Sequence, residues 1–252
     1  MRRVHPRIGL RDSDVILASY PKSGNTWMRF IWANLVSELE LGGREVDFHL
    51  LNGEMICDHN RHLYGGLEYH SLPRLVKTHQ PFDARVFRGN RILYLHRHPC
   101  DVMESYHAFR FAKLRRSRVT QLSLSQFIRD EKYGIPAWGE HVRSWLPNAT
   151  VVSSYEALRE HTASEVSRIL SALEIPGIGR EAIEDAVKRA SLANVRRLEE
   201  RSGRPDQAIF EDGFRFTRRG EVGGWRSAFD RANRHWVRTE IERLSLSDRF
   251  AV

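Results

Sequence analysis

Near its start the chain reads Val15-Ile16-Leu17-Ala18-Ser19-Tyr20-Pro21-Lys22-Ser23-Gly24-Asn25-Thr26-Trp27. Four apolar residues come first, a polar turn containing Gly24 follows, and apolar residues then recur at helical spacing through Leu39. The pattern predicts a buried strand, a tight turn and an amphipathic helix. A helix N-terminus offers unpaired backbone N–H groups and the positive end of a dipole, so this turn is a candidate phosphate cradle. Its lysine precedes the glycine, unlike that of the GxxxxGK[ST] loop of nucleotide triphosphatases.

The lysines of the chain favour the phosphate interpretation, although ordinary strand–helix turns are also rich in Ser, Gly and Asn. Only five of the 40 lysines and arginines are lysine, and Lys22 and Lys77 are two of them. A lysine kept in so arginine-rich a sequence indicates a position that needs a compact ammonium rather than a planar guanidinium. The formal net charge of +8 favours anionic ligands: nucleotides, acidic substrates or nucleic acid.

The size and composition of the chain are those of a globular α/β protein. With 252 residues, 41% of them hydrophobic, we predict a single domain over residues 1–252. No apolar run approaches the ~20 residues that a membrane span requires, and the first residues lack the apolar segment of a signal peptide. Two cysteines, Cys57 and Cys100, cannot form a disulfide framework, so we expect a reducing, cytoplasmic location.

Apolar runs alternate with helical patterns along the rest of the chain. Further strands are expected at 74–77, 91–96 and 150–153, and further helices at 101–111, 123–131, 155–173, 180–189 and 231–244. This order predicts an α/β fold with a central, mostly parallel sheet and helices on both faces. Residues 42–71 and 202–224 show little pattern, and loops of this length are usually lids or substrate walls.

In open parallel sheets, ligands bind at the carboxyl ends of the strands. Lys22, His79, Arg97 and Tyr155 each follow the end of a different predicted strand, so four strands deliver polar groups to one edge. Histidine is the usual general base, although a structural role for His79 is the alternative. Arg97 and Ser105, two helical turns further on, form a possible phosphate-binding pair.

A late basic loop, from Phe216 to Arg226, is interrupted by glycines. Arg218, Arg219 and Gly220 suit a second phosphate, and the two arginines have no evident partner in the sequence; a solvated charge run is the alternative. We interpret the basic run 110–118 as a solvated helix face. No metal site is predicted, because the spacing of Asp58, His59 and His62, and of His96 and His98, is not that of a zinc site.

Four motifs together resemble the cytosolic-type sulfotransferases, which use 3′-phosphoadenosine 5′-phosphosulfate (PAPS) as sulfuryl donor. They are the turn Tyr20–Trp27, the segment Lys77-Thr78-His79-Gln80-Pro81, the pair of Arg97 and Ser105, and the loop Arg218–Trp225, in the family's order and spacing. The resemblance runs from about residue 14 to the C-terminal helix.

The resemblance implies a donor site. Its members would be Lys22, Ser23, Gly24, Asn25, Thr26 and Trp27 at the 5′-phosphosulfate, and Arg97, Ser105, Arg218, Arg219 and Gly220 at the 3′-phosphate. Trp27 and Tyr155 would approach the adenine, and His79 would be the catalytic base. The chain departs from the family at Asn25, Arg219 and Gly224, and Leu192 stands where an aromatic residue would stack on the adenine. The family's C-terminal dimer motif is not recognisable, which leaves the oligomeric state open.

The sequence therefore predicts an enzyme that moves a sulfuryl group from PAPS to a hydroxyl or similar nucleophile of a small or medium acceptor and leaves 3′,5′-adenosine bisphosphate (PAP). His79 would take the acceptor proton, Lys22 would neutralise the charge on the bridging oxygen, and Lys77 would hold the sulfuryl oxygens. No metal and no nucleic-acid partner are expected. The alternatives are a Mg²⁺-dependent phosphate-loop kinase and a non-catalytic protein that binds nucleotides or nucleic acid.

Overall fold

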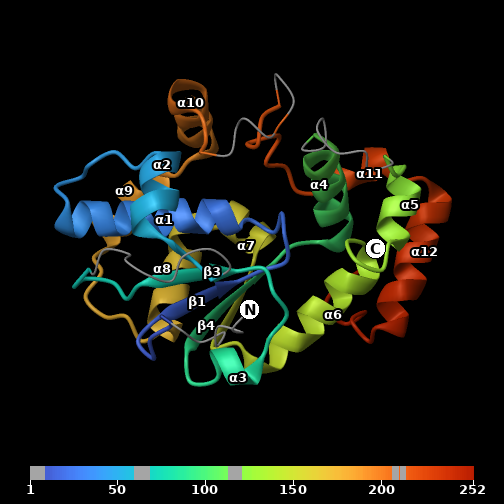
Figure 1. Cartoon of the computed structure of the whole chain (residues 1–252), viewed down its shortest axis with the longest axis horizontal. Coiled ribbons are helices and arrows are strands. Elements are labelled where there is room, and N and C mark those ends of the chain that lie inside the picture. Colours follow the sequence, from blue (N-terminus) through green and yellow to red (C-terminus); the bar gives the residue numbers. More distant parts are fainter. Residues whose placement is uncertain (1–8, 60–68, 113–120, 206–209, 211–213) are drawn as a thin grey trace, which may run out of the picture.

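Short, buried apolar segments form a five-stranded parallel sheet at the centre of the molecule (Figure 1). The computed structural model describes residues 9–59, 69–112, 121–205, 210 and 214–252. The strands are β1 (Val15–Ala18), β2 (Cys57–Asp58), β3 (Leu75–Thr78), β4 (Arg91–His96) and β5 (Val151–Ser154), in the spatial order β2-β3-β1-β4-β5. The predicted α/β class and parallel sheet are confirmed. β2 was not predicted, because two residues carry no strand pattern.

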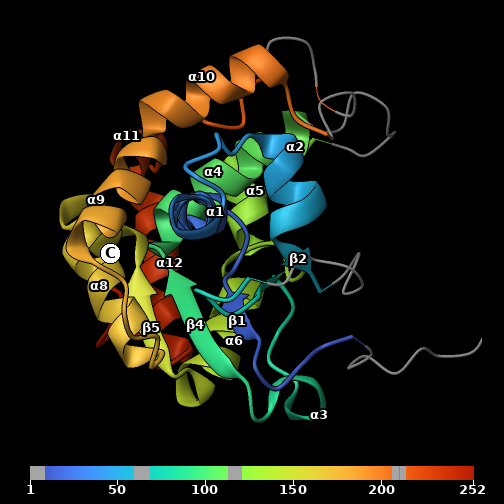
Figure 2. The ribbon, with the colours of Figure 1, turned by 90° about the vertical axis from the view of Figure 1, so that its left-hand side faces the viewer.

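Each face of the sheet has its own hydrophobic core. β1 is fully buried, and its residues alternate between the two cores, since successive side chains of a strand point to opposite faces. One core joins Val15 and Leu17 to α1 (Asn25–Glu40), α8 (Thr162–Ala172) and α9 (Arg180–Arg189). The other joins Ile16 and Ala18 to α4 (Pro99–Ala112), α5 (Leu124–Arg129), α6 (Ile135–Trp145) and α12 (Arg231–Arg243). Figures 1 and 2 show these two helical layers on either side of the sheet.

The strand register brings four strand ends to one level. Ala18 of β1 lies opposite Thr78 of β3 and Tyr94 of β4, and His96 at the end of β4 lies opposite Ser154 at the end of β5. The residues that follow these strands therefore emerge along a single edge, as predicted.

Several helices differ from the sequence prediction. The helix expected over 155–173 is two helices, α7 (Tyr155–Glu160) and α8, which meet at His161. The structure adds α6 and α10 (Leu192–Ser202), which were not predicted. Apolar residues at helical spacing on both, and the side chain of Ser191 capping α10, were signals in the sequence.

The two segments predicted as loops also contain structure. Residues 42–71 include α2 (Phe48–Leu50), the π-helical turn Leu51–Met55 and β2, while residues 60–68 lie outside the described part. In the described part of 202–224 no helix or strand follows α10, and α11 (Trp225–Ala228) comes next. The remaining short elements are α3 (Ala84–Phe87) and the 3₁₀ turn Leu146–Asn148. Among the described residues, none of the helices has the length and apolar character that a membrane span requires.

Candidate active site

The turn between β1 and α1 is held in a conformation that few residues can adopt. Gly24, at the N-cap of α1, has a φ of 97°, in the left-handed region. A Cβ at this position would also lie 2.8 Å from Cδ2 of Tyr155, too close for a carbon contact. Lys22 has a φ of 70° without being a glycine, so this turn stores backbone strain where the sequence predicted an anion cradle.

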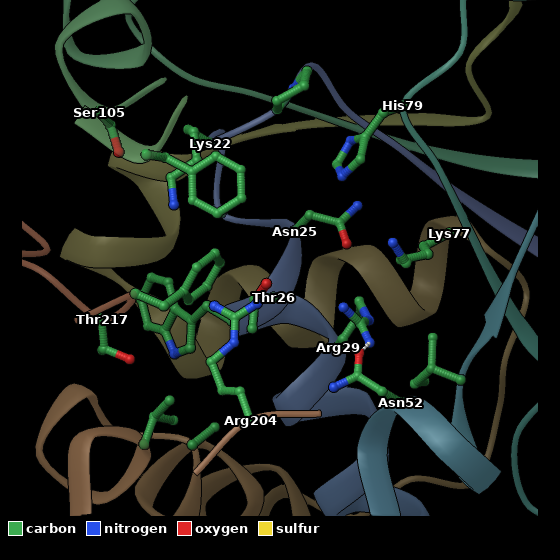
Figure 3. Close-up of a pocket in the computed structure, with 18 of the residues that line it drawn as sticks. Lys22, Asn25, Thr26, Arg29, Asn52, Lys77, His79, Ser105, Arg204 and Thr217 are labelled. Atoms are coloured by element: carbon green, nitrogen blue, oxygen red, sulfur yellow. Dashed lines mark hydrogen bonds between the residues drawn. The ribbon is translucent and has the colours of Figure 1, made fainter. Parts of the chain in front are cut away.

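A cavity of about 1030 Å³ opens at the carboxyl edge of the sheet, next to this turn. Figure 3 shows side chains from the turn after β1, from the end of β3, from α1 and α4 and from the late loop around it. The predicted residues that line it are Lys22, Gly24, Asn25, Thr26, Trp27, Lys77, His79, Arg97, Ser105, Tyr155, Arg218 and Gly220. Ser23 is fully buried under the turn, and Arg219 is outside the lining.

His79 is fixed by its hydrogen bonds in one tautomer. Its Nδ1 lies 2.8 Å from the carbonyl oxygen of Ser19, which can only accept, so Nδ1 must carry the proton. Nε2 is then unprotonated. Burial, followed by the charge of Lys77, lowers the pKa of His79 to about 4, so the ring is neutral at physiological pH. Asn25 supports this arrangement by donating to the hydroxyl of Ser19 at 3.1 Å.

Lys77, at the end of β3, forms an ion pair with Asp58 of β2, with Nζ 2.8 Å from Oδ2. Both side chains are about 18% exposed, so the pair is only partly hydrated. Asp58 was considered in the sequence only as a possible metal ligand. In the structure its carboxylate fixes the ammonium of Lys77 beside His79 and the cavity.

Lys22 lies among aromatic rings and other cations. Its Nζ is 3.8 Å from the centre of the Phe216 ring and 4.6 Å from that of Phe109, within the range of cation–π attraction. Burial, followed by the guanidinium of Arg204 and other nearby guanidinium groups, lowers the pKa of Lys22 to about 7. The ammonium is therefore at the midpoint of its titration near neutral pH and would gain from an anion in the cavity.

Arg97 and Tyr155 form a second part of the wall, past the ends of β4 and β5. The guanidinium of Arg97 lies 4.4 Å from the centre of the Tyr155 ring and donates to the carbonyl oxygen of Glu221 at 2.7 Å. Trp27 of α1 contacts the same tyrosine edge-on, with ring centres 5.8 Å apart. These two aromatic rings offer a surface on which a base could pack.

The two arginines of the late loop do have a partner, contrary to the sequence prediction. Glu104, one residue before Ser105 on α4, lies 3.3 Å from Arg218 and 3.6 Å from Arg219. The carboxylate thus holds the basic loop against α4 at the position where an anionic ligand was expected. Local sequence could not show this pair, because its members are 114 and 115 residues apart.

Gly220 and Leu192 define the far side of the cavity. A Cβ on Gly220 would lie 2.9 Å from Cδ2 of Leu192 and 3.5 Å from the hydroxyl of Tyr155, and its φ is 66°. Leu192, the first residue of α10, lines the cavity with a branched aliphatic side chain at the position where the family resemblance suggested an aromatic ring.

Further cavity residues were not identified from the sequence. Arg29 of α1, Asn52 of the π-helical turn and Arg204 after α10 all line the cavity. Arg29 could have been noticed as a charge within the apolar run of α1, one helical turn after Asn25. Asn52 and Arg204 come from segments without a pattern, so only the fold reveals them.

Residues considered as metal ligands in the sequence have other surroundings. His98 stacks on Trp225 with ring centres 5.1 Å apart, and His96 packs edge-on against Phe250. His62 lies outside the described residues, as do residues 113–118 of the basic run. In the part of the chain that the structure describes, no three His, Cys, Asp or Glu side chains gather as a metal site.

A strained turn at a helix N-terminus, two groups of cations and a neutral histidine in one cavity define an enzyme that transfers a group from an anionic donor. Residues 12–243 match the family described as "Sulfotransferase domain". The chain therefore belongs to this family and is a PAPS-dependent sulfotransferase, as its motifs predicted.

Relatives of known name agree with this assignment. The chain is 27% identical over 249 residues to "Sulfotransferase 1E1" of Rattus norvegicus, covering 92% of this chain and 83% of that protein. It is 26% identical over 259 residues to "Cytosolic sulfotransferase 12" of Arabidopsis thaliana, covering 94% and 78%.

Solved structures share the fold. Retinol dehydratase in a complex with retinol and PAP superposes with a TM-score of 0.70 at 19% identity, covering 96% of this chain and 83% of that one. Mouse sulfotransferase SULT7A1 complexed with PAP gives a TM-score of 0.67 at 19% identity, covering 94% and 86%.

Proposed function

We propose that His79 is the general base of the sulfuryl transfer, with Lys22 and Lys77 as its electrostatic partners. The observation that supports this most directly is the hydrogen bond from Nδ1 of His79 to the Ser19 carbonyl oxygen at 2.8 Å. It leaves Nε2 as a proton acceptor in the cavity that the anion-binding turn borders. The depressed pKa of His79 keeps this nitrogen unprotonated at neutral pH.

The reaction then follows from these positions. Nε2 of His79 accepts the proton of the acceptor hydroxyl, whose oxygen forms a bond to sulfur. The bond between sulfur and the bridging oxygen of the donor breaks, and PAP leaves with that oxygen. Lys22, in the turn that would hold the 5′-phosphate, neutralises the charge that builds on the bridging oxygen. Lys77, held by Asp58, stabilises the negative charge on the sulfuryl oxygens while the group is transferred.

We assign donor binding to the residues that the sequence predicted. The turn from Ser23 to Trp27 would bind the 5′-phosphate through the N-terminal N–H groups of α1. Arg97, Ser105 and the loop Arg218–Gly220 would bind the 3′-phosphate, with Arg219 reaching in from the rim where Glu104 now holds it. Tyr155 and Trp27 would flank the adenine.

The acceptor would be a small or medium hydroxyl-bearing molecule rather than nucleic acid. The cavity supports this size class, because about 1030 Å³ must hold both the donor and the acceptor. We also infer a cytoplasmic location, which the low number of cysteines, two in the sequence, and the cytosolic relatives support.

The test combines binding and turnover. The protein should bind PAP in calorimetry with EDTA present, and should move label from sulfur-labelled PAPS to simple phenols without added metal. His79→Asn should bind PAP with nearly unchanged affinity and lose turnover. PAP binding only with Mg²⁺, or phosphoryl transfer from ATP, would favour the kinase alternative, and turnover by His79→Asn at the normal rate would refute the base.

A further inference from the structure

Arg29 is a buried cation that lines the cavity, and the sulfuryl transfer proposed above gives it no role. It lies in the second turn of α1 and is 5% exposed, yet it lines the same cavity as His79 and Lys77. Asn25, one turn earlier at i−4, lies on the same face of the helix and donates to Ser19, the residue that also fixes His79. Figure 3 shows Arg29 between Lys77 and Asn52, on the His79 side of the site.

Among the residues that the structure describes, no carboxylate forms an ion pair with Arg29. Its Nη2 donates to the amide oxygen of Asn52 at 2.5 Å, and its buried Nε has no hydrogen-bond partner within the described ranges. The carboxylate of Asp58 is within electrostatic range of Arg29 but pairs with Lys77 at 2.8 Å. Glu54 also lines the cavity, on an exposed turn. Burying a guanidinium costs free energy when the carboxylate nearest to it is also paired with a lysine. A bound anion would offset that cost.

The 3′-phosphate of the donor does not supply that anion. Trp27, which would flank the adenine, precedes Arg29 by two residues, and two residues rotate about 200° around a helix. Trp27 accordingly contacts Tyr155, whose ring supports Arg97, on the side of the predicted 3′-phosphate site. Arg29 faces the other half of the cavity, with Lys77 and His79, where the acceptor hydroxyl must approach.

We propose that Arg29 binds a carboxylate of the acceptor, so that the enzyme sulfates hydroxyl-bearing carboxylic acids. The proposal rests on the assignment of His79 as base, which fixes the acceptor half of the cavity. A guanidinium presents a planar fork of donors that matches the two oxygens of a carboxylate, and its unpartnered Nε provides one of them. Asn52 keeps the guanidinium in place from the opposite side.

Matched acceptor pairs test the proposal. The substrates are 4-hydroxybenzoate, 4-hydroxyphenylacetate and 3-(4-hydroxyphenyl)propionate, each beside its methyl ester, assayed with labelled PAPS. At least one acid should exceed its ester in kcat/KM by about 10- to 100-fold, the range of a charge-assisted, two-bond contact. Arg29→Gln should abolish that preference, and Arg29→Lys should retain part of it.

Two further measurements complete the test. Arg159→Gln removes an exposed cavity cation whose guanidinium lies 5.8 Å from the Trp27 ring, and it should preserve the preference for the acid. The affinity of Arg29→Gln for PAP, measured by calorimetry, reports whether the variant is folded. If it is not folded, the proposal is decided by the acid preference of Arg29→Lys and by the melting temperature of the wild-type PAP complex with each acid and each ester.

The outcomes separate the two claims. Failure to bind PAP and to sulfate any phenol would refute the proposed function itself. Sulfation or binding without preference for any acid, or a preference that survives in Arg29→Gln, would overturn the carboxylate site while leaving His79 in place.

Discussion

Donor binding should take up a proton at Lys22. In the free enzyme the pKa of this lysine is about 7, because burial and the surrounding guanidinium groups disfavour its charged form. A bound nucleotide reverses that balance by placing phosphate next to the ammonium, so the pKa rises on binding. The pKa of this cation is higher in the complex than in the free enzyme. The affinity for the nucleotide is therefore greatest below pH 7 and falls as the pH rises above 7.

The size of the effect can be worked out at pH 8. One unit above a pKa of about 7, roughly nine-tenths of the free enzyme has lost the Lys22 proton, so binding should take up about 0.9 proton. His79, Arg29 and the phosphates themselves contribute little at this pH. The pKa of His79 is about 4 and that of Arg29 about 10, and phosphate groups with a second pKa near 6 are already dianionic. Affinity should weaken by up to about tenfold per pH unit above 7.

Calorimetry measures this uptake directly. PAP is titrated into the protein at pH 8 in HEPES and in Tris, whose ionisation enthalpies differ, and the slope of the observed enthalpy gives the proton count. Lys22→Met is the control and should show no uptake. A wild-type uptake below about 0.3 proton, or an equal uptake in Lys22→Met, would refute the assignment of the low pKa to Lys22.

Three further substitutions test the remaining parts of the site. His79→Ala should lower kcat by about 10²–10⁴ and leave PAP affinity nearly unchanged, as single-turnover transfer and calorimetry will show; near-normal turnover would remove the base. Glu104→Gln should tighten PAP binding by about 2- to 10-fold, because the carboxylate now pairs with the arginines assigned to the 3′-phosphate. Unchanged or weaker PAP binding would contradict that competition. Gly24→Ala should lower the melting temperature by several degrees more than Gly42→Ala, which shares a positive φ but meets no atom within 4 Å; equal losses would exclude the contact with Tyr155.

The parts of the fold that sequence predicted well are those with a dense local signal. β1 and the start of α1 combine an uninterrupted apolar run, a glycine turn and helical periodicity, and β4 lies at the predicted residues. Strand ends in a parallel sheet share an edge, so Lys22, His79 and Arg97 could be placed together without coordinates. The catalytic roles of these residues stay a prediction.

The missed features depend on contacts between distant segments. Asp58 meets Lys77 only because a two-residue strand, too short to show a pattern, joins the edge of the sheet. Glu104 meets Arg218 across more than a hundred residues, and no local rule selects that partner. Arg29 was within reach of sequence reasoning, but its significance depends on which carboxylate is nearby, and that is a property of the fold.

The side chain of Tyr155 contacts both ends of the predicted donor site. It borders Gly24 in the turn, lies beneath Arg97, and its hydroxyl comes next to Gly220. This one side chain therefore sets the separation between the two predicted anion-binding sites. We expect donors to be distinguished by the span between their phosphates, and not only by the number of charges they carry. A substitution that shifts this ring should change the positions of both predicted anion-binding sites together. Position 155 is therefore where we expect donor selectivity to be altered by design.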